Sequence, residues 1–190
     1  MYIQPPGTFG AGFGDLCSWK DSKGNVQLLS ILARQAQNPH WKWYVEAHGG
    51  ERKPEGFVGF LRSSLKDIEP KPPLDLPTSR LFRGVGIACL NSTLLSGKEN
   101  VSVIFKSDPF GTVSHGYDAQ NSFLLYAFGK RLLIRSGERD IHGSEFHKHW
   151  MWETKSENCL TFEEISQIPH SWKAKGRIER FADTAEASYV

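Results

Sequence analysis

The sequence has no long hydrophobic run. Its longest uninterrupted apolar stretch covers only residues 123–128. A helix that spans a membrane needs roughly 18 to 20 apolar residues, so we expect no membrane partner. Proline and glycine dominate the residues after Met1, and no basic segment followed by an apolar one opens the chain, so no secretion signal is predicted within it.

An excess of one charge is also lacking. Lys and Arg total 23 and Asp and Glu total 21, which gives a net charge of +2 and a pI near 8.4. A nucleic-acid-binding domain usually carries a basic stripe or has a pI above about 9. We therefore expect no nucleic-acid partner.

Cysteine is scarce and unpatterned. Cys17, Cys89 and Cys159 are the three cysteines, and no two of them form a Cys-x-x-Cys pair. An odd number without that spacing argues against a disulfide framework and against a zinc ribbon. We interpret the three as small side chains in an apolar core.

Aromatic residues, in contrast, are abundant, with 6 Trp, 12 Phe and 5 Tyr beside 7 His. Hydrophobic residues make up 39% of the 190, which is enough for a core in one or two domains. Aromatic rings pack against sugar faces as readily as they fill a core, so the composition is also compatible with a carbohydrate-binding surface.

The first third of the chain predicts short helices. Apolar residues recur at helical spacing over residues 26–36, and the Asn-Pro pair at 38–39 ends that segment. A second helix is predicted over about 41–48 and a third around 57–65. Helices this short cannot enclose a core alone, so we interpret them as part of a larger helical array.

A proline-rich segment divides the chain. Residues 69–77 contain four prolines, which can propagate neither a helix nor a central strand, so we expect an extended linker. The predicted domains are a helical one over residues 1–68, the linker over 69–79 and a sheet domain over 80–190.

After the linker, short β-rich runs alternate with turn signals, which is typical of an antiparallel sheet or sandwich. A hairpin turn is predicted over residues 128–131. The sequence stops amid this pattern, so we expect the chain to be a fragment. The predicted strands are Gly84–Leu90, Val101–Lys106, Ser122–Phe128, Arg131–Arg135, Cys159–Phe162 and Gly176–Phe181.

Two segments have the composition of functional loops. The glycine-rich opening, residues 7–14, lacks the Gly-Lys-Ser/Thr ending of a phosphate loop, so we interpret it as a turn-rich entry to the first helix. Residues 108–123 hold the densest group of reactive side chains, with His115 between Gly111 and Gly116. A histidine in a loop on a rigid sheet can accept a proton or donate one to a substrate carboxylate.

The sequence around this histidine resembles the heparinase II/III-like polysaccharide lyases, a group that includes alginate lyases. The most specific block is Ser-His-Gly-Tyr-Asp-Ala-Gln-Asn-Ser-Phe. Weaker similarity extends upstream, through Gly-Phe-Gly-Asp at 12–15 to Trp-Lys-Trp-Tyr at 41–44. The blocks that carry the resemblance are residues 114–123, 126–129, 136–137, 143–150 and 154–158.

The resemblance implies an α+β multidomain fragment: the last helices of an α/α toroid, followed by an antiparallel β-sandwich domain. It also implies a polysaccharide lyase that cleaves uronate-containing chains by β-elimination, and a full-length protein that is secreted or periplasmic. Its partner would be an anionic polysaccharide.

The resemblance further implies roles for individual residues. His115 matches the catalytic histidine of the family's sheet domain, whereas the other catalytic groups, a Tyr with a His or Asn, come from toroid helices. Since no block of this sequence matches those groups, we expect the isolated chain to be inactive. The expected substrate contacts are Tyr117, Gln120, Asn121 and His147.

The sequence departs from the family at its structural zinc site. Tyr117, Arg135 and Glu157 stand at the three ligand positions, and tyrosine and arginine are poor zinc ligands. We therefore expect no metal or other cofactor there, and we predict that Arg135 pairs with Glu157. A separation of their charged ends beyond about 6 Å would contradict the pairing. A relocated metal site built from His142, His147 and His149 is the alternative.

Two other functions stay open at the level of sequence. A uronyl epimerase passes through the same intermediate as a lyase. A non-catalytic glycan-binding or structural protein on this fold would also account for the missing zinc ligands.

Overall fold

A computed structural model describes residues 4–8, 12–14, 26–50, 57, 68–137, 140–163 and 165–190. Short helices come first in the described chain and short strands follow. In chain order the elements are α1 Val26–Gln35, α2 Pro39–Ala47, β1 Arg80–Phe82, η1 Arg83–Val85, β2 Ile87–Asn91, β3 Val101–Lys106, β4 Ser122–Ala127, β5 Lys130–Leu133, η2 His147–Met151, η3 Thr154–Ser156, β6 Ala182–Asp183 and β7 Ser188–Tyr189.

Helices α1 and α2 pack together through an apolar core. The periodicity of residues 26–36 places Leu29 and Ala33 on one face, where they meet Tyr44 and Val45 of α2 together with Ile68. The first predicted helix is therefore confirmed. Among the described residues, no helix has the length and apolar character needed to cross a bilayer.

The second predicted helix is confirmed but begins earlier than expected. The side chain of Asn38 accepts a hydrogen bond from the backbone N–H of Trp41 at 3.0 Å and so caps α2. Pro39 fits the first turn, where no N–H is required. The Asn-Pro pair thus ends one helix and starts the next. The third predicted helix, around 57–65, lies outside the described residues except for Phe57.

The proline-rich linker forms neither helix nor strand, as predicted, but it is fastened to α2. The backbone N–H of Lys71 donates to the carbonyl of Pro39 at 3.1 Å, and Nδ1 of His40 lies 2.9 Å from the carbonyl of Lys71. The carboxylate of Asp75 lies 3.5 Å from Nε2 of His40 and also pairs with Lys71. The start of the sheet region is therefore tied to the start of α2.

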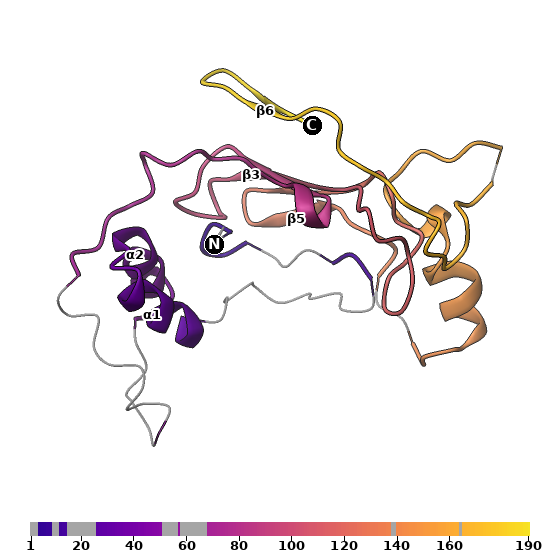
Figure 1. Cartoon of the computed structure of the whole chain (residues 1–190), viewed down its shortest axis with the longest axis horizontal. Helices are drawn as coiled ribbons and strands as arrows, with labels where there is room; N and C mark the ends of the chain where they lie inside the picture. The colour runs from indigo at the N-terminus through magenta and orange to yellow at the C-terminus, as the bar shows by residue number, and fades with distance from the viewer. Residues whose placement is uncertain are drawn as a thin grey trace.

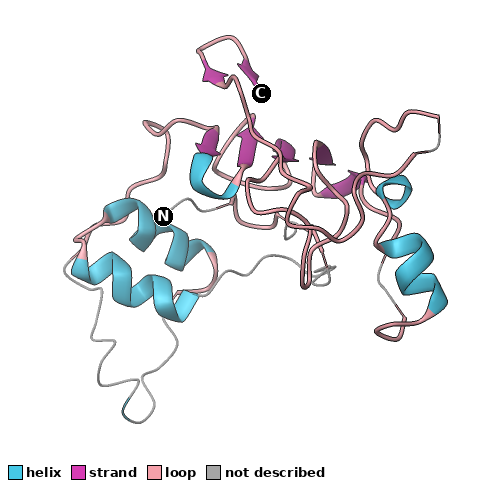
Figure 2. Ribbon diagram, turned by 45° about the vertical axis from the view of Figure 1, so that its right-hand side comes forward, coloured by secondary structure: helices cyan, strands magenta, loops and turns pink. Residues whose placement is uncertain are grey.

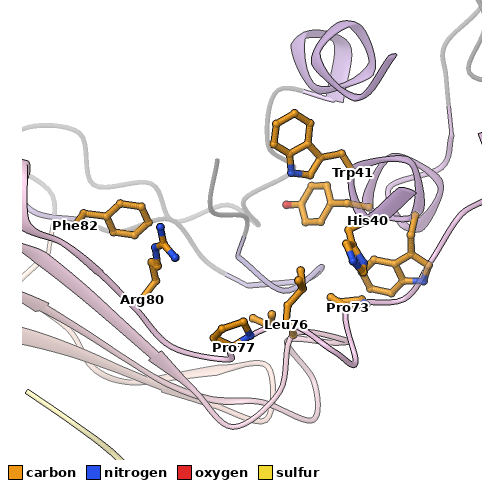
Figure 3. Close-up of a pocket in the computed structure, with 10 residues that line it drawn as sticks. His40, Trp41, Pro73, Leu76, Pro77, Arg80 and Phe82 are labelled. Carbon is orange, nitrogen blue, oxygen red and sulfur yellow. The ribbon is translucent and has the colours of Figure 1, made fainter. Parts of the chain in front are cut away.

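A hollow of about 280 Å³ lies between α2, the linker and the edge of the sheet. Figure 3 shows Trp41 of α2 on one side, Arg80 and Phe82 of β1 on another, and the linker prolines beneath. Its lining is mostly aromatic and apolar: His40, Trp41, Trp43, Tyr44, Pro73, Leu76, Pro77, Arg80, Phe82 and Leu94.

Strands β1 to β5 form one antiparallel sheet in sequence order. Alternation along the strands turns one side of each toward the core, so Cys89, Ile104 and Leu124 stand opposite one another on three neighbouring strands. Figure 1 shows the helix pair at one end of this sheet and the segment that contains η2 at the other.

The turn between β4 and β5 is the predicted hairpin. Phe128 and Gly129 both have positive φ, at 51° and 71°, which matches the right-handed twist of the two strands. The backbone N–H of Phe128 donates to the carbonyl of Asn100 at 2.9 Å, and this bond holds the turn against the chain before β3.

Several strand predictions are wrong. Residues 84–86 form a tight helical turn before β2, and β5 ends at Leu133, so Arg135 leaves the sheet. Residues 159–162 do not form a strand of the main sheet. Only Asn158, just before them, bonds β4: its side chain donates to the carbonyl of Phe123, and its carbonyl accepts from the N–H of Phe123. Residues 176–181 have no strand partner among the described residues.

Strands β6 and β7 form a second, two-stranded sheet (Figure 2), and hydrogen bonds of Ser79, directly before β1, with Asp183 and Ser188 join it to the edge of the main sheet. The described residues therefore show an antiparallel sheet with helices, and not the second full layer of the predicted sandwich.

The described cysteines are free thiols. Burial raises the pKa of both Cys89 and Cys159 to about 11, and the charge of Glu157 adds to the shift at Cys159. Thiols that stay protonated are unreactive, as expected for the apolar role predicted for them. Cys89 is buried in the sheet core, and Cys159 is half-buried. Cys17 lies outside the described residues.

Candidate functional site

The loop between β3 and β4, residues 107–121, contains His115. The backbone N–H of Gly116 donates to the carbonyl of Val113 at 3.1 Å, which closes a tight turn, and Ser114 adopts a φ of 59°. The turn leaves His115 exposed while its neighbours from Tyr117 to Gln120 are buried. A large ligand can therefore reach this imidazole from outside.

The backbone of His115 rests against the glycine-rich segment near the start of the chain. Gly14 has a φ of +94°, and a Cβ added there would collide with the carbonyl oxygen of His115. Glycine is thus required at position 14 both for its conformation and for this close approach.

The base of the loop is fixed by hydrogen bonds of Gln120. Its side-chain oxygen accepts from the backbone N–H of Asp108 at 2.8 Å, and its side-chain nitrogen donates to the carbonyl of Ala174 at 2.7 Å. The side chain of Gln167 both accepts from the backbone N–H of Gln120 and donates to its carbonyl. Because the Gln120 amide is buried and used internally, its expected role as a substrate contact gains no support.

The other expected substrate contacts divide into one exposed and two buried residues. Asn121 is exposed, although its side-chain oxygen accepts from the hydroxyl of Ser107 at 2.8 Å. Tyr117 and His147 are 1% and 0% exposed. A side chain without accessible surface offers no atom to a sugar, so the expected roles of Tyr117 and His147 as substrate contacts gain no support.

His147 is the first residue of the helical turn η2. Its Nδ1 accepts from the backbone N–H of Gly143 at 2.9 Å, and its Nε2 lies 3.5 Å from the hydroxyl of Tyr117. His149 is exposed and pairs with Glu145 at 3.2 Å. Residues two apart in a helical turn do not share a face, so His147 and His149 do not point to one place, as the alternative metal site would require.

Arg135 lies next to Tyr117 and Glu157, so the three residues at the family's zinc-ligand positions are neighbours. Its guanidinium carbon lies 4.1 Å from the centre of the Tyr117 ring, and its Nε lies 4.0 Å from Oε1 of Glu157. The side chains of Arg135 and Glu157 are each 1% exposed. The predicted pairing is therefore confirmed.

Buried carboxyl groups near this cluster have raised pKa values. Burial raises the pKa of Glu157 to about 7, against the opposing charges of Arg135 and Lys106. Burial also raises the pKa of Asp118, although a backbone hydrogen bond from His170 works in the other direction. Perturbed carboxyl groups are common at functional sites, and composition alone gave no sign of Asp118.

The residues at these positions do not fit a zinc ion. Zinc requires about four nitrogen, sulfur or carboxylate donors, whereas here one carboxylate faces a permanent positive charge. Across the described residues, including His142, His147 and His149, no group of three His, Cys, Asp or Glu side chains is arranged to hold a metal.

The fold is similar to those of solved lyase structures. It matches a heparan sulfate lyase, HepC from Pedobacter heparinus, with a TM-score of 0.60 at 17% identity, and covers 88% of this chain and 23% of that one. It matches a crystal structure of heparinase III with a TM-score of 0.61 at 16% identity, and covers 96% of this chain and 27% of that one. The chain thus spans about a quarter of the length of these proteins, and at such identities the likeness concerns the fold alone.

The sequence match to a family is more specific. The profile of the family described as Heparinase II/III-like, C-terminal matches residues 75–189, which is more than half of the chain. A comparison with curated protein sequences gave no significant match. The chain belongs to the heparinase II/III-like family.

Proposed function

We propose that this chain supplies His115 to a polysaccharide lyase that cleaves uronate-containing chains by β-elimination. The observation that supports it best is the braced loop, which presents an exposed imidazole within the part of the chain that matches the family. Similar solved structures are named as heparinase III and heparan sulfate lyases, which favours an anionic polysaccharide as substrate.

The chemistry of the reaction accounts for a histidine at this place. The proton at C5 of a uronate becomes acidic enough to remove only when the charge of the adjacent carboxylate is neutralised. A base then takes that proton, the C4–O bond breaks as a C4–C5 double bond forms, and an acid protonates the leaving oxygen. His115 either donates to the carboxylate or assists removal of the proton, and Asn121 offers an exposed amide at the end of the same loop.

The remaining catalytic groups would come from a toroid domain. In this proposal residues 1–68 are the end of that domain, residues 69–79 are the linker, and residues 80–190 belong to the sheet domain. The complete protein would act outside the cytoplasm, in a secreted or periplasmic location. The 190 residues alone would be inactive because the site is shared between domains.

The test is incubation of the complete protein with alginate, heparin, heparan sulfate, chondroitin sulfate and ulvan. A lyase generates an unsaturated uronate that absorbs in the ultraviolet. The change His115→Ala should lower the initial rate by about 100-fold or more, the range typical of a lost general acid or base. Lys130→Ala, at the exposed β4–β5 turn, is the control and should leave the rate unchanged.

The outcomes separate the alternatives. Glycan binding without the ultraviolet signal would contradict lyase activity and favour a binding protein. Exchange of the C5 proton with solvent without chain cleavage would favour an epimerase. An unchanged rate in the folded His115→Ala variant would remove this histidine from the mechanism.

A further inference from the structure

Arg135 is among the largest fully buried side chains of the described chain, at 2% exposure. A charge out of contact with water is costly unless other groups compensate it. Three groups lie against it here. The Tyr117 ring lies beneath the guanidinium, and the carbonyl of Gly14 accepts a hydrogen bond from Nη1. Oε1 of Glu157 lies 4.0 Å from Nε, close enough for charge attraction, although neither of these two atoms has a hydrogen-bond partner among the described residues.

Two of these contacts flank His115. Gly14 packs against the carbonyl of His115, where only a glycine fits. The carbonyl of Gly14 in turn accepts a hydrogen bond from Nη1 of Arg135. Tyr117 lies two residues after His115 and stacks on the same guanidinium. The backbone of His115 thus lies between Gly14 and Tyr117, and both of these residues contact the guanidinium of Arg135. The guanidinium itself lies 4.1 Å from the centre of the Tyr117 ring.

Glu157 and Tyr117 connect the guanidinium to the rest of the region. Glu157 directly follows η3, and the hydroxyl of Tyr117 faces Nε2 of His147 in η2. Arg135 therefore joins the loop to the irregular segment after β5. A metal ion can organise chain segments in the same way, but the donor set described above does not fit one.

We propose that Arg135 is the positioning residue for His115, with its guanidinium acting as a fixed internal cation that holds the loop without a divalent metal. The effect expected on kcat rests on the proposed function, whereas the effect expected on the accessibility of His115 does not. Arg135 acts through Gly14 and Tyr117 and is not itself a catalytic residue.

The test compares Arg135→Ala, Arg135→Lys and the exposed control Arg180→Ala in the complete protein. A displacement of His115 by about 1 Å should lower kcat by about 100-fold in Arg135→Ala. KM should change by less than about threefold, because the loss lies in the transition state. Arg135→Lys should recover part of kcat, and added guanidinium ion, below concentrations that unfold the protein, should raise kcat of Arg135→Ala but not of His115→Ala.

A second readout does not depend on turnover. Diethyl pyrocarbonate acylates accessible imidazoles, and mass spectrometry of peptides reports each histidine separately. In Arg135→Ala the acylation rate of His115 should rise by about threefold as the loop loosens, while that of exposed His149 stays constant. If the guanidinium is the organising cation, an excess of EDTA should leave the Tm of the unaltered protein unchanged.

The two proposals fail in different ways. A folded Arg135→Ala variant with unchanged His115 acylation would overturn the positioning role, whatever the activity. A drop in Tm with EDTA would show that a metal, and not the guanidinium, is the organising cation. If the unaltered protein releases no unsaturated uronate but His115 acylation responds to Arg135→Ala, the proposed function fails and the positioning role stands.

Discussion

The contacts that stabilise the helix pair differ in kind from those that stabilise the His115 loop. Between α1 and α2 the buried side chains are largely apolar, with Leu29 and Val45 at the centre. Around the loop the buried side chains include Asp118, Arg135 and Glu157. Apolar packing tolerates small shifts, whereas a buried polar network requires one particular arrangement. The contacts of the loop therefore fix its geometry more than they add to stability, whereas those of the helix pair mainly add to stability.

Truncation in the helix pair should produce the largest loss of stability. Leu29 is 2% exposed, so Leu29→Ala removes apolar contacts and leaves a cavity, at a cost of about 3 to 4 kcal/mol in the free energy of unfolding. Leu28→Ala is the matched control, because Leu28 is 47% exposed, and should cost less than about 1 kcal/mol. Urea unfolding followed by circular dichroism measures both. Equal losses would contradict an apolar core on one face of α1.

The polar network around Glu157 should add a pH dependence to the free energy of unfolding. With a folded pKa of about 7 against 4.5 for the free group, Glu157 holds its proton more tightly in the folded state. Its contribution is fully present below pH 4.5 and is lost as pH rises through 7, about 3 kcal/mol in total. Urea unfolding between pH 5 and 8 measures this slope, and Glu157→Gln should remove it.

Neighbouring charges also act on the pKa of Glu157 and so on the pH dependence of the free energy of unfolding. Arg135 and Lys106 favour the ionised carboxylate, and Asp118 opposes it, but burial outweighs them. In the helix pair, burial raises the pKa of Tyr44 to about 12, outside the range tested. An unchanged slope in Glu157→Gln would assign the pH dependence to another group.

The smallest expected effect isolates a single close approach. Gly14 and Gly49 have the same φ of +94°, but only at Gly14 does an added Cβ meet a neighbour, the carbonyl of His115. Gly49→Ala should cost about 1 kcal/mol from backbone strain alone, and Gly14→Ala about 2 kcal/mol or more. Urea unfolding gives both values. Equal losses of unfolding free energy in the two variants would show that the contact between Gly14 and His115 is not rigid.

The sequence predicts the regular parts of the fold because their signals are local. Strand β3 matches the predicted residues 101–106, and β4 ends one residue before its predicted end. The turn at Phe128 and Gly129 follows from local backbone preference. By contrast, residues 159–162 contain strand-forming types, but the chain there meets Phe123 through Asn158 in an irregular contact that no local pattern encodes.

The candidate site shows the same limit. The turn signals around His115 predict an exposed loop histidine, and the departures from the family pattern predict that Arg135 meets Glu157. Burial of Tyr117 and His147 could not be predicted, because it depends on segments distant in sequence packing around the loop. Polar residue types in a loop resemble a binding surface whether they face solvent or each other.

The fastening of the linker to α2 has a consequence for how the two halves of the chain communicate. A free proline-rich tether would let the sheet region sample many orientations, and the effective concentration of His115 at any point on a helical partner would be low. With Lys71 and Asp75 held at the first turn of α2, few residues remain between the last anchor and β1. The linker therefore acts as a fixed connection, and the entropy of bringing the two halves into register is largely lost during folding.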